Sequence, residues 1–577
     1  MSQQTSNEKF WLKSYDKHVP PTLTYPTEDL GTLLTQNMKN YADKVGFYFM
    51  DRTFLFTEIL EYSQKFATFL QKNGMKKGDV LAIALPNTPQ YLFSVYGAYI
   101  AGGTVTGCSL LLSPDEIAYQ MKDSGAKFLV TMDIVHEMLF SKIYDRLPDL
   151  KVIVPTNIAE FMGISKIKLF MGKLFKKDLR EKLRKGKIIP WPGKTVIPFL
   201  KALDTEIDLE KVDIDPKKDL ALIIYTGGTT GVPKGVEVVH SNLIANLHQF
   251  DVWLNREKGK EILLAAFPFF HIAGFITGLF LNFLGGAQIL IADPRNNDHI
   301  IKEIIDKKPT SFGNVPTLFL MIQKNPLSKK IPPEVLDNIS LYVSGAAPFP
   351  AEAIREFERQ FHTENKFLEV YGLTETAIVT GNPMFGEKKL GTVGLPWPNT
   401  EIKLIDLDTG EEIKEIGQTG EILIKGPQVA KQYHNKPEAT AAAFDNEGYF
   451  HSGDVGVFDD DGYLKIVDRT KDMLSVSGFK VYSVHVEEVM TKHPDIQILA
   501  IIGVPNPDRP GAEIVKAIIQ LKEGVEAIDK VKDSIKKYAE ENLSKYEVPK
   551  IWDFREELPL TMVGKVKKKA LREELKK

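Results

Sequence analysis

The chain carries the stretch Tyr225-Thr-Gly-Gly-Thr-Thr-Gly-Val-Pro-Lys-Gly235 directly after the apolar run Leu220-Ala-Leu-Ile-Ile224. A short apolar run before a glycine-rich loop is typical of a buried strand that ends in a phosphate-binding turn. Glycines let backbone N–H groups approach anionic oxygens, threonine hydroxyls add donors, and Lys234 adds a positive charge. The spacing differs from that of the Walker A loop. The alternative is an ordinary glycine-rich surface turn.

Short apolar runs alternate with stretches of helical periodicity on both sides of this loop. The alternation covers residues 30–220 and resumes over 261–375, which predicts βαβ units and a mainly parallel sheet. Over 385–470 short strands lie between glycine turns, as in a small β-barrel or sheet, and a compact βα pattern follows. We therefore expect an α/β protein with a large N-terminal domain (1–470) and a small, mobile α+β C-terminal domain (471–577).

The composition is that of a soluble globular protein. The 577 residues are too many for one hydrophobic core, and 43% of them are apolar and 26% charged. The net charge of −3 gives no overall attraction to nucleic acid, so no such partner is expected. The single cysteine, Cys108, excludes an intrachain disulfide and a zinc-cysteine site. The single cysteine, the polar N-terminus and the lack of a long apolar run together predict a cytoplasmic protein without a membrane-spanning helix.

The segment Ile164–Lys187 differs from its surroundings. It is rich in Lys and Arg, poor in acids, and interleaved with large apolar residues. Such a segment suits peripheral contact with an anionic membrane, with its apolar side buried among the lipids. The alternative is a basic, solvent-facing insertion that packs on its own domain.

A second cluster, Glu369-Val-Tyr-Gly-Leu-Thr-Glu375, follows the run Leu341-Tyr-Val-Ser-Gly-Ala-Ala-Pro348. A strand that ends in small residues lets a flat base lie against the backbone, and Tyr371 is suited to stack on that base. Glu375 supplies a hard oxygen ligand for Mg²⁺. The alternative is a plain strand-to-helix turn.

Three further residues lie in polar turns. Asp454 is suited to accept hydrogen bonds from two vicinal ribose hydroxyls, although a lone aspartate in a glycine turn is usually a cap. Arg469 suits ribose or phosphate, and the alternative there is an exposed interdomain linker with ordinary salt bridges. Lys565 follows a glycine in a proline-framed turn, and the alternative is a solvated lysine in a basic tail.

Together these five motifs, in this order, resemble the adenylate-forming superfamily of acyl-CoA synthetases, peptide-synthetase adenylation domains and luciferases. The resemblance covers nearly the whole chain and is greatest to long-chain fatty acyl-CoA ligases of the bacterial and archaeal type. It implies ATP, Mg²⁺ and coenzyme A as cofactors and cosubstrates, and a fatty acid as substrate.

The resemblance also implies roles for individual residues. Thr226 and Glu375 would contact Mg²⁺, Lys565 would enter the site for adenylation, and Lys471 would be the hinge between the domains. The residues implied to bind the nucleotide or coenzyme A are Thr226, Gly227, Gly228, Thr229, Thr230, Gly231, Lys234, Gly345, Ala346, Ala347, Glu369, Tyr371, Gly372, Thr374, Asp454, Arg469, Lys471, Ser477, Gly478 and Lys480. The residues expected at the acid pocket are His271, Asn246, Gly274 and Val315.

Two positions depart from the family's pattern. Ser483 stands where proline is common, and His485 stands where an acid is common. Both follow the hinge loop and leave the implied site residues intact. They put in doubt only the local geometry of the C-terminal domain and its contact with coenzyme A.

The implied reaction has two steps. A carboxylate is a poor electrophile, and joining it to AMP gives a mixed anhydride with a good leaving group. The first step brings two anions together, and Lys565, Mg²⁺ and the loop's N–H donors would offset their repulsion. The second step needs coenzyme A where pyrophosphate was. We therefore expect the small domain to rotate about Lys471, which removes Lys565 and brings Gly478 forward.

The expected acid pocket is apolar, and no acid near Phe269–His271 could pair with an ammonium group, which argues against an amino-acid substrate. His271 is expected to be a gate or packing residue. Short-chain hydroxy-acid or aryl-acid CoA ligases and acyl-AMP ligases with a carrier-protein acceptor stay open. A non-catalytic lipid-binding relative is opposed by the intact Lys565, Glu375 and Asp454. Chain length and oligomeric state are not determined, and a homodimer stays open.

Overall fold

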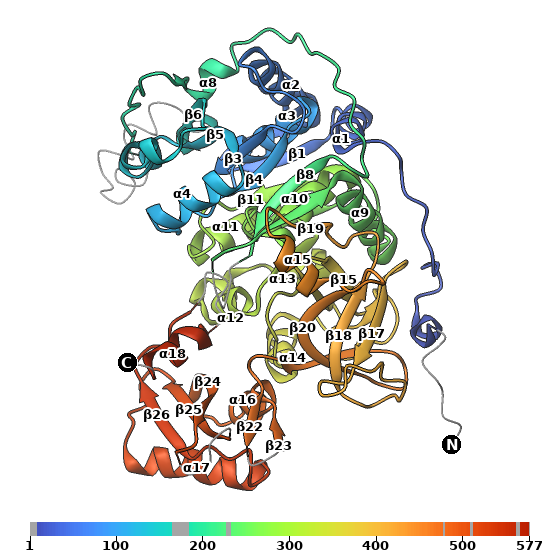
Figure 1. Cartoon of the computed structure of the whole chain (residues 1–577), viewed down its shortest axis with the longest axis vertical. Coiled ribbons are helices and arrows are strands. Elements are labelled where there is room, and N and C mark those ends of the chain that lie inside the picture. The colour runs from blue at the N-terminus through green and yellow to red at the C-terminus, as the bar shows by residue number, and fades with distance from the viewer. Residues whose placement is uncertain are drawn as a thin grey trace.

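A computed structural model describes residues 9–163, 184–226, 232–476, 479–507, 512–560 and 566–575. The expected site residues that lie outside these ranges are Gly227–Gly231, Ser477, Gly478 and Lys565, together with most of the segment Ile164–Lys187. In Figure 1 two large sheets and their helices form the upper part of the molecule, a smaller sheet lies below them, and the C-terminal residues form a separate lobe.

The first large sheet has eight strands, in the order β19 (Gln432–Tyr433), β9 (Gly235–Val239), β8 (Leu220–Tyr225), β4 (Thr104–Gly107), β3 (Val80–Ala84), β5 (Ala126–Met132), β6 (Val152–Thr156) and β7 (Thr195–Val196). The strands from β8 to β7 run parallel, whereas β9 and β19 are antiparallel to their neighbours. β3 is a fully buried apolar run, as is usual in parallel sheets covered on both faces. β8 and β9 flank the glycine-rich loop, which therefore leaves the sheet at the end of β8.

The second large sheet has nine strands, in the order β16 (Leu395–Pro396), β15 (Ala377–Gly381), β14 (Phe367–Leu373), β13 (Leu341–Ser344), β12 (Ser311–Asn314), β10 (Ile262–Ala265), β11 (Ala287–Leu290), β1 (Val45–Phe49) and β2 (Arg52–Leu55). The strands from β14 to β1 are parallel, and the outer strands are antiparallel. The predicted mainly parallel arrangement is thus confirmed in both large sheets.

Two largely buried helices lie in the core of this large part. α9 (His240–Leu254) packs on β8 and β9 of the first sheet and on β15 of the second, and α10 (Ile272–Leu284) packs on α9. The apolar run Ile276–Leu284 lies within α10 and is mostly buried. The other helices of the large part are α1 (Leu30–Asn40), α2 (Phe56–Lys72), α3 (Pro89–Ile100), α4 (Pro114–Asp123), α5 (Asp133–Met138), α8 (Phe199–Ala202), α11 (Asn297–Lys307), α12 (Pro316–Lys324), α13 (Pro333–Asn338), α14 (Ala351–Phe361) and α15 (Pro437–Ala443).

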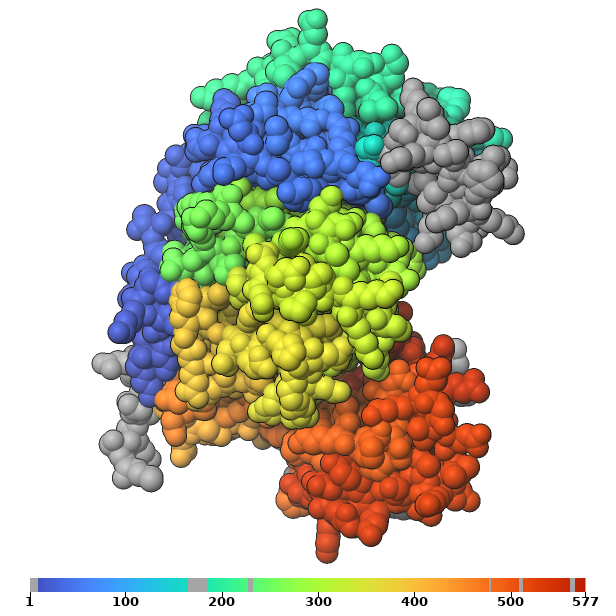
Figure 2. Space-filling model, turned by 180° about the vertical axis from the view of Figure 1, so that it is seen from behind, coloured from blue at the N-terminus to red at the C-terminus, as the bar shows by residue number. Residues whose placement is uncertain are grey.

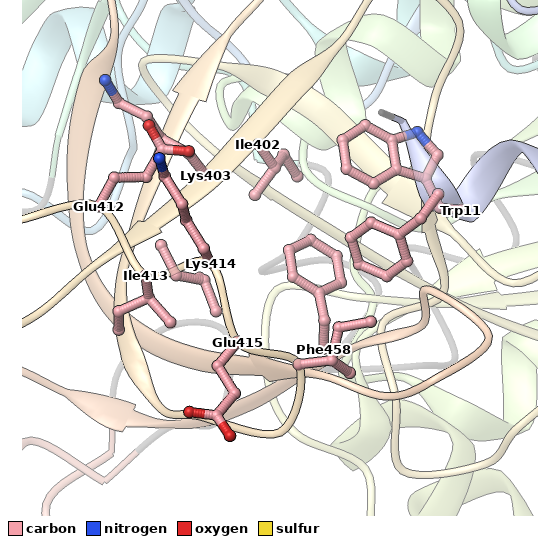
Figure 3. A pocket seen from close by; sticks show the side chains of 11 residues that line it. Trp11, Ile402, Lys403, Glu412, Ile413, Lys414, Glu415 and Phe458 are labelled. Carbon is pink, nitrogen blue, oxygen red and sulfur yellow. The ribbon is translucent and has the colours of Figure 1, made fainter. Parts of the chain in front are cut away.

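The region predicted as a small β-barrel or sheet is a four-stranded antiparallel sheet. Its strands are β17 (Glu401–Ile405), β18 (Gly420–Lys425), β20 (Phe450–Phe458) and β21 (Leu464–Arg469), in that order. The N-terminal turn packs on it, because the ring of Trp11 stacks on Phe458 at 5.8 Å beside a small pocket lined by both apolar and charged side chains (Figure 3).

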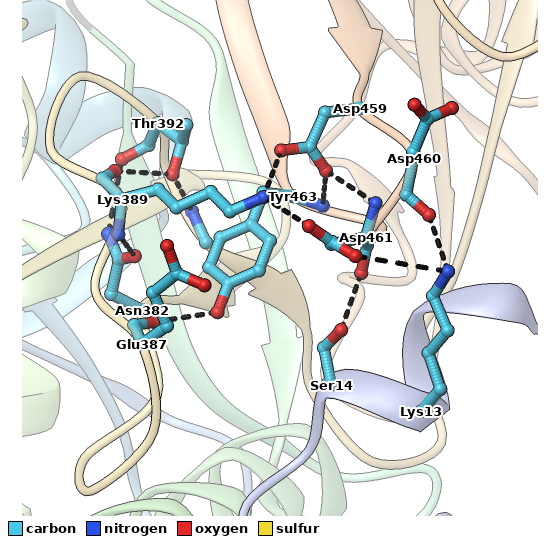
Figure 4. Close-up of polar contacts among 11 residues, drawn as sticks. Lys13, Ser14, Asn382, Glu387, Lys389, Thr392, Asp459, Asp460, Asp461 and Tyr463 are labelled. Carbon is cyan, nitrogen blue, oxygen red and sulfur yellow. Dashed lines mark hydrogen bonds and ion pairs between the residues drawn. The ribbon is translucent and has the colours of Figure 1, made fainter.

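A polar clamp fixes the turn between β20 and β21. The Lys389 ammonium lies 2.7 Å from a carboxylate oxygen of Asp459 and 2.7 Å from one of Asp461, and Ser14 donates to the Asp461 carbonyl at 2.8 Å (Figure 4). The clamp joins the N-terminal turn, the loop before β16 and the β20–β21 hairpin. It therefore holds the two strands that carry Asp454 and Arg469.

The C-terminal lobe has its own hydrophobic core, whose buried residues all lie at or beyond Leu474. It contains the hairpin β22 (Leu474–Val476) and β23 (Phe479–Val481), the sheet β24 (Ile496–Pro505), β25 (Glu513–Leu521) and β26 (Ile551–Arg555), and the helices α16 (Ser483–Met490), α17 (Asp529–Asn542) and α18 (Lys568–Glu574). Figure 2 shows this lobe projecting from the rest of the molecule. The predicted α/β fold with a large N-terminal and a small C-terminal domain is confirmed. Within the ranges that the structure describes, every helix is too short or too polar to span a lipid bilayer.

Candidate nucleotide and acid site

Tyr371, Asp454 and Arg469, here called the Asp454 cluster, meet at one point. Asp454 on β20 lies opposite Arg469 on β21 in the strand register, and the Arg469 Nε is 3.0 Å from Asp454 Oδ1. The Tyr371 hydroxyl, from β14 of the second large sheet, donates to Asp454 Oδ2 at 2.8 Å. These contacts bring together three of the residues that the sequence assigns to the base and the ribose.

The electrostatics of the Asp454 cluster favour a fixed carboxylate. The adjacent Asp454 carboxylate raises the pKa of Arg469, and burial together with the same carboxylate raises the pKa of Tyr371. Arg469 therefore keeps its positive charge and Tyr371 keeps its proton at neutral pH. The Asp454 side chain is 4% exposed, whereas that of Arg469 is 37% exposed. A buried acceptor beside a partly exposed cation suits a polyhydroxylated, anionic ligand.

Small residues shape the backbone next to this cluster. A Cβ atom on Gly345 would lie 2.9 Å from Val370 Cγ2, and one on Gly372 would lie 1.9 Å from the Ala377 carbonyl oxygen. Ala346 has a φ of 64°, which is rare for an alanine and costs conformational energy. Such strained, closely packed turns occur at ligand sites, where a flat group approaches the backbone. Ala347 continues this turn, and Thr374 lies in the turn between β14 and β15.

Glu369 on β14 is a buried acid, and within the described part of the chain no cation is among its hydrogen-bond partners. Burial raises its pKa to about 8, and its carboxyl group accepts a hydrogen bond from the Gly391 N–H at 2.9 Å. The carboxyl group is therefore mostly protonated at neutral pH. It braces the loop before β16.

A second group, here called the Glu375 trio, consists of Lys234, Glu375 and Tyr433. The Tyr433 hydroxyl donates to Glu375 Oε1 at 2.7 Å, and the Lys234 ammonium lies 4.5 Å from the centre of the Tyr433 ring. Burial raises the pKa of Glu375, and the hydrogen bond from Tyr433 partly offsets this effect. The Thr226 N–H donates to the Lys234 carbonyl at 3.0 Å, which closes the two ends of the glycine-rich loop.

The oxygen ligands available at this loop suit a hard cation. A carboxylate from Glu375 and a hydroxyl from Thr226 are the oxygen ligands that Mg²⁺ takes, usually together with phosphate oxygens and water. Among the side chains that the structure describes, no group of three or more His, Cys, Asp or Glu residues could hold a metal ion by itself. A cation here would therefore take its remaining oxygen ligands from phosphate or water.

Tyr433 is a site residue that the sequence analysis missed. It lies 58 residues after Glu375 in the chain, on the two-residue strand β19 that pairs with β9 beside the glycine-rich loop. Ser452 was missed as well, and its hydroxyl accepts the Asp454 N–H at 3.0 Å. In the sequence, Tyr433 is only an aromatic residue shortly before a Pro-Glu pair, and nothing near it indicates Glu375. Ser452 is only a serine two residues before Asp454, and its residue type does not indicate the hydrogen bond.

The proposed hinge lies beside the Asp454 cluster. Burial lowers the pKa of Lys471, and the neighbouring Arg469 lowers it further. Asp472 pairs with Arg572 of α18 at 2.8 Å, so α18 lies next to the hinge residues. Lys480 is elsewhere, because its ammonium pairs with Asp408 in the β17–β18 turn at 2.7 Å. The structure therefore does not bring Lys480 to the Asp454 cluster in this orientation of the lobe.

The four residues expected at the acid pocket lie on and around α9, α10 and α12. His271 caps α10 by accepting the Ala273 N–H, and its ring is 5.5 Å from that of Phe267. A Cβ on Gly274 would lie 2.0 Å from the Pro268 carbonyl oxygen, so this position requires glycine. Val315 is a buried residue at the start of α12. Asn246 is fully buried, and its amide donates to the Ile378 carbonyl at 2.7 Å, so it supports β15.

Comparison with known proteins agrees with this geometry. Residues 34–434 match the model of the AMP-binding enzyme family, and residues 485–565 match that of the AMP-binding enzyme C-terminal domain. The chain is 35% identical to a long-chain-fatty-acid–CoA ligase of Bacillus subtilis and 34% identical to one of Escherichia coli O6:H1, each over 98% of both chains. The ATP-bound structure of MatB from Rhodopseudomonas palustris is similar with a TM-score of 0.78 and 26% identity, over 95% of this chain and 99% of that one. The chain therefore belongs to the family of AMP-binding enzymes, the adenylate-forming superfamily.

Proposed function

We propose that this chain is an ATP-dependent fatty acid–CoA ligase. It activates a medium- or long-chain fatty acid to an acyl-adenylate with release of pyrophosphate and then transfers the acyl group to coenzyme A, forming acyl-CoA and AMP. The observation that carries the proposal is that Arg469 of the Asp454 cluster interacts electrostatically with Glu375 of the trio, in a chain that matches long-chain-fatty-acid–CoA ligases over 98% of its length.

In the first step the fatty-acid carboxylate attacks the α-phosphate. Asp454 accepts hydrogen bonds from the ribose hydroxyls, and Tyr371 and the turn Gly345–Ala347 hold the adenine. Thr226 and Glu375 would hold Mg²⁺, which supplies positive charge to the phosphates. Lys234 and the N–H groups of the glycine-rich loop bind the phosphates leaving as pyrophosphate, and Lys565 stabilises charge at the reacting centre.

The second step requires coenzyme A to reach the acyl-adenylate. We propose that the small domain turns about Lys471, so that Lys565 leaves and the segment around Gly478 borders the pantetheine path. Support comes from the separate hydrophobic core of the C-terminal lobe, which lets that lobe move as a unit. The division of the chain into a large domain (1–470) and a small domain (471–577) is part of this proposal.

The acid itself is proposed to be an unsubstituted fatty acid. The residues around α10 are apolar, and the chain offers no carboxylate between Phe267 and Gly274 to pair with an ammonium group. Thioester formation measured with coenzyme A and acids from acetate to oleate, with hydroxy and aryl acids included, tests this. We expect the greatest turnover with the longer fatty acids. A preference for hydroxy or aryl acids, or a need for a carrier protein, would replace the proposed substrate or acceptor. Absence of AMP release with every acid would refute the function.

Contact with membranes is a separate part of the proposal. We propose a cytoplasmic enzyme whose basic segment Ile164–Lys187 touches anionic lipid peripherally. Sedimentation with anionic vesicles at low and high salt tests this part, and no binding at low salt would end it.

A further inference from the structure

Asp468, the residue before Arg469, is a fully buried carboxylate. Its hydrogen bonds to Ser483 join residues on opposite sides of the proposed hinge. Asp468 lies on β21 of the large domain, and its exposed fraction is zero. Its Oδ1 accepts the Ser483 hydroxyl at 3.0 Å, and its Oδ2 accepts the Ser483 N–H. Since Ser483 is the first residue of α16, the large domain supplies a hydrogen-bond acceptor to a helix of the small domain.

This contact satisfies a helix end that has no cap of its own. The residue before α16, Tyr482, makes no capping hydrogen bond with its side chain. The first N–H groups of a helix need acceptors, and a carboxylate at that end also interacts favourably with the helix dipole. Asp468 meets both needs from across the hinge, at a distance of 15 residues along the chain.

The contact continues into α18. The Lys568 ammonium donates to the Ser483 hydroxyl at 2.8 Å and pairs with Glu487 Oε1 at 2.7 Å. The same Glu487 oxygen accepts the Ile501 N–H at 2.7 Å. A path of hydrogen bonds, buried at Asp468 and Ser483 and partly buried at Lys568, therefore runs from β21, through the start of α16, to the first residue of α18.

Lys568 is three positions after Lys565, the residue expected to serve adenylation. In the present orientation α18 also pairs through Arg572 with Asp472, beside the Asp454 cluster. A rotation about Lys471 changes the separation of Asp468 and Ser483, because they lie on opposite sides of that residue. The path can therefore be complete in one orientation of the small domain and must open in another.

We propose that Asp468, Ser483 and Lys568 form a latch that holds the small domain in the orientation for acyl-adenylate formation and that opens before thioester formation. This inference rests on the proposed function of the chain. The latch depends on Ser483, the position at which the family commonly has proline, because proline has neither the N–H nor the hydroxyl that Asp468 accepts. Asp468, Ser483 and Lys568 are thus positioning residues that act through the segment carrying Lys565.

The variant Ser483→Pro gives the sharpest test. Proline is favoured at the first position of a helix, and Tyr482 already has the extended backbone that a following proline requires, so α16 should persist. Ser483→Ala keeps the N–H and removes only the hydroxyl. Ser534→Ala is the matched control, because it removes a serine hydrogen bond, to His493 at 3.1 Å, within the small domain.

Each half-reaction is measured alone, with ATP and palmitate for the first and with supplied palmitoyl-adenylate and coenzyme A for the second. We expect Ser483→Pro to slow the first by about tenfold or more, since it removes two hydrogen bonds to a charged group, and to leave the second unchanged or faster. Ser483→Ala and Lys568→Met should fall between Ser483→Pro and the wild type. Lys565→Ala provides the reference for a first-step defect. Equal slowing of both half-reactions, or no slowing of the first, would overturn the latch.

A distance measurement separates the latch from the reaction. Spin labels on Lys414→Cys and Lys537→Cys, both exposed positions in the two domains, report the orientation without substrates. Cys108 stays unlabelled because it is fully buried and burial raises its pKa to about 12. In Ser483→Pro we expect a second population with a different distance between the two labels, which Ser534→Ala should not show. An unchanged distance distribution in Ser483→Pro would overturn the latch. If the wild type forms no adenylate with any acid, the proposed function fails, and the distances alone decide the latch.

Discussion

Two groups in this molecule are built from the same three residue types, yet only one lies at the proposed nucleotide site. In the Glu375 trio the tyrosine hydroxyl donates to Glu375 and a lysine lies over the ring. In the second group, here called the Glu401 trio, the Tyr449 hydroxyl donates to Glu401 at 3.1 Å and Lys403 lies 4.1 Å from the ring centre.

The difference lies in what surrounds each carboxylate. Glu401 is on a small antiparallel sheet, 42% exposed, and Lys9 lies 3.4 Å from its carboxylate. Glu375 accepts a hydrogen bond from Tyr433, whose ring lies under Lys234 at the end of the glycine-rich loop, and the glycines and threonines in that stretch of sequence suit phosphate. A lysine over a tyrosine that donates to a glutamate therefore does not make a binding site by itself. The arrangement can serve as a site only where neighbouring elements supply further hydrogen-bond donors to a ligand.

Loss of the Glu375 charge should have the largest effect. We expect Glu375→Gln to slow acyl-adenylate formation by about 10²–10³-fold, as for removal of one group that stabilises the transition state. Glu401→Gln removes the same charge from the Glu401 trio and should leave the rate unchanged. ATP–pyrophosphate exchange measures both. Similar losses in the two variants would show that the trios do not differ in function.

The lysines should show the next largest difference. Lys234→Met removes a phosphate-binding charge and should raise the KM for ATP by about 10- to 100-fold, the loss expected for a hydrogen bond between charged groups. Lys403→Met is the matched variant. Steady-state kinetics with varied ATP distinguishes them, and an unchanged KM for Lys234→Met would assign that lysine to packing on Tyr433.

The tyrosine hydroxyls provide a finer test. Tyr433→Phe keeps the ring under Lys234 but removes the hydrogen bond to Glu375, and should lower acyl-adenylate formation by about tenfold. The requirement for Mg²⁺ should rise, because the carboxylate is no longer held in place. Tyr449→Phe removes the corresponding hydrogen bond from the Glu401 trio and should change neither quantity. Equal Mg²⁺ dependence in wild type and Tyr433→Phe would contradict the positioning role.

The smallest effect concerns stability. Burial raises the pKa of Glu375, so the folded protein binds this proton more tightly than the unfolded chain does. The contribution of Glu375 to stability is therefore present at low pH and is lost as the pH rises from the ordinary pKa of 4.5 through the raised one. The Tm of Glu375→Gln minus the Tm of the wild type should therefore increase by about 1–3 °C between pH 5 and pH 8. Thermal denaturation at several pH values measures this, and a constant difference would contradict it.

The sheets were the most predictable part of the molecule. Runs such as Val80–Leu85 and Leu220–Ile224 are short, apolar and bounded by turn residues, and both are strands. The ends of strands are harder to predict: a short run that starts at Ile339 leads into β13, which begins only at Leu341. Ends of elements depend on packing, which periodicity along the chain does not record.

The site was predictable where one motif supplied one residue. Asp454, Arg469 and Tyr371 were each singled out as candidates with a structural alternative left open, the resemblance assigned their roles, and the structure joins them. Tyr433 was not, because nothing near it in the chain indicates Glu375. A hydrogen bond between residues 58 positions apart is set by the pairing of β19 with β9, and strand pairing across a sheet leaves no local signature.

The sequence by itself determined the α/β architecture, the order of the motifs and the chemistry available at each, because periodicity and turn residues are local properties of the chain. Only the tertiary structure decided which residues share a site. Asp468 and Arg469 are neighbours on β21, yet Arg469 joins the Asp454 cluster and Asp468 joins the small domain. Successive side chains of a strand point to opposite faces, so what each one contacts depends on the elements that pack on its face.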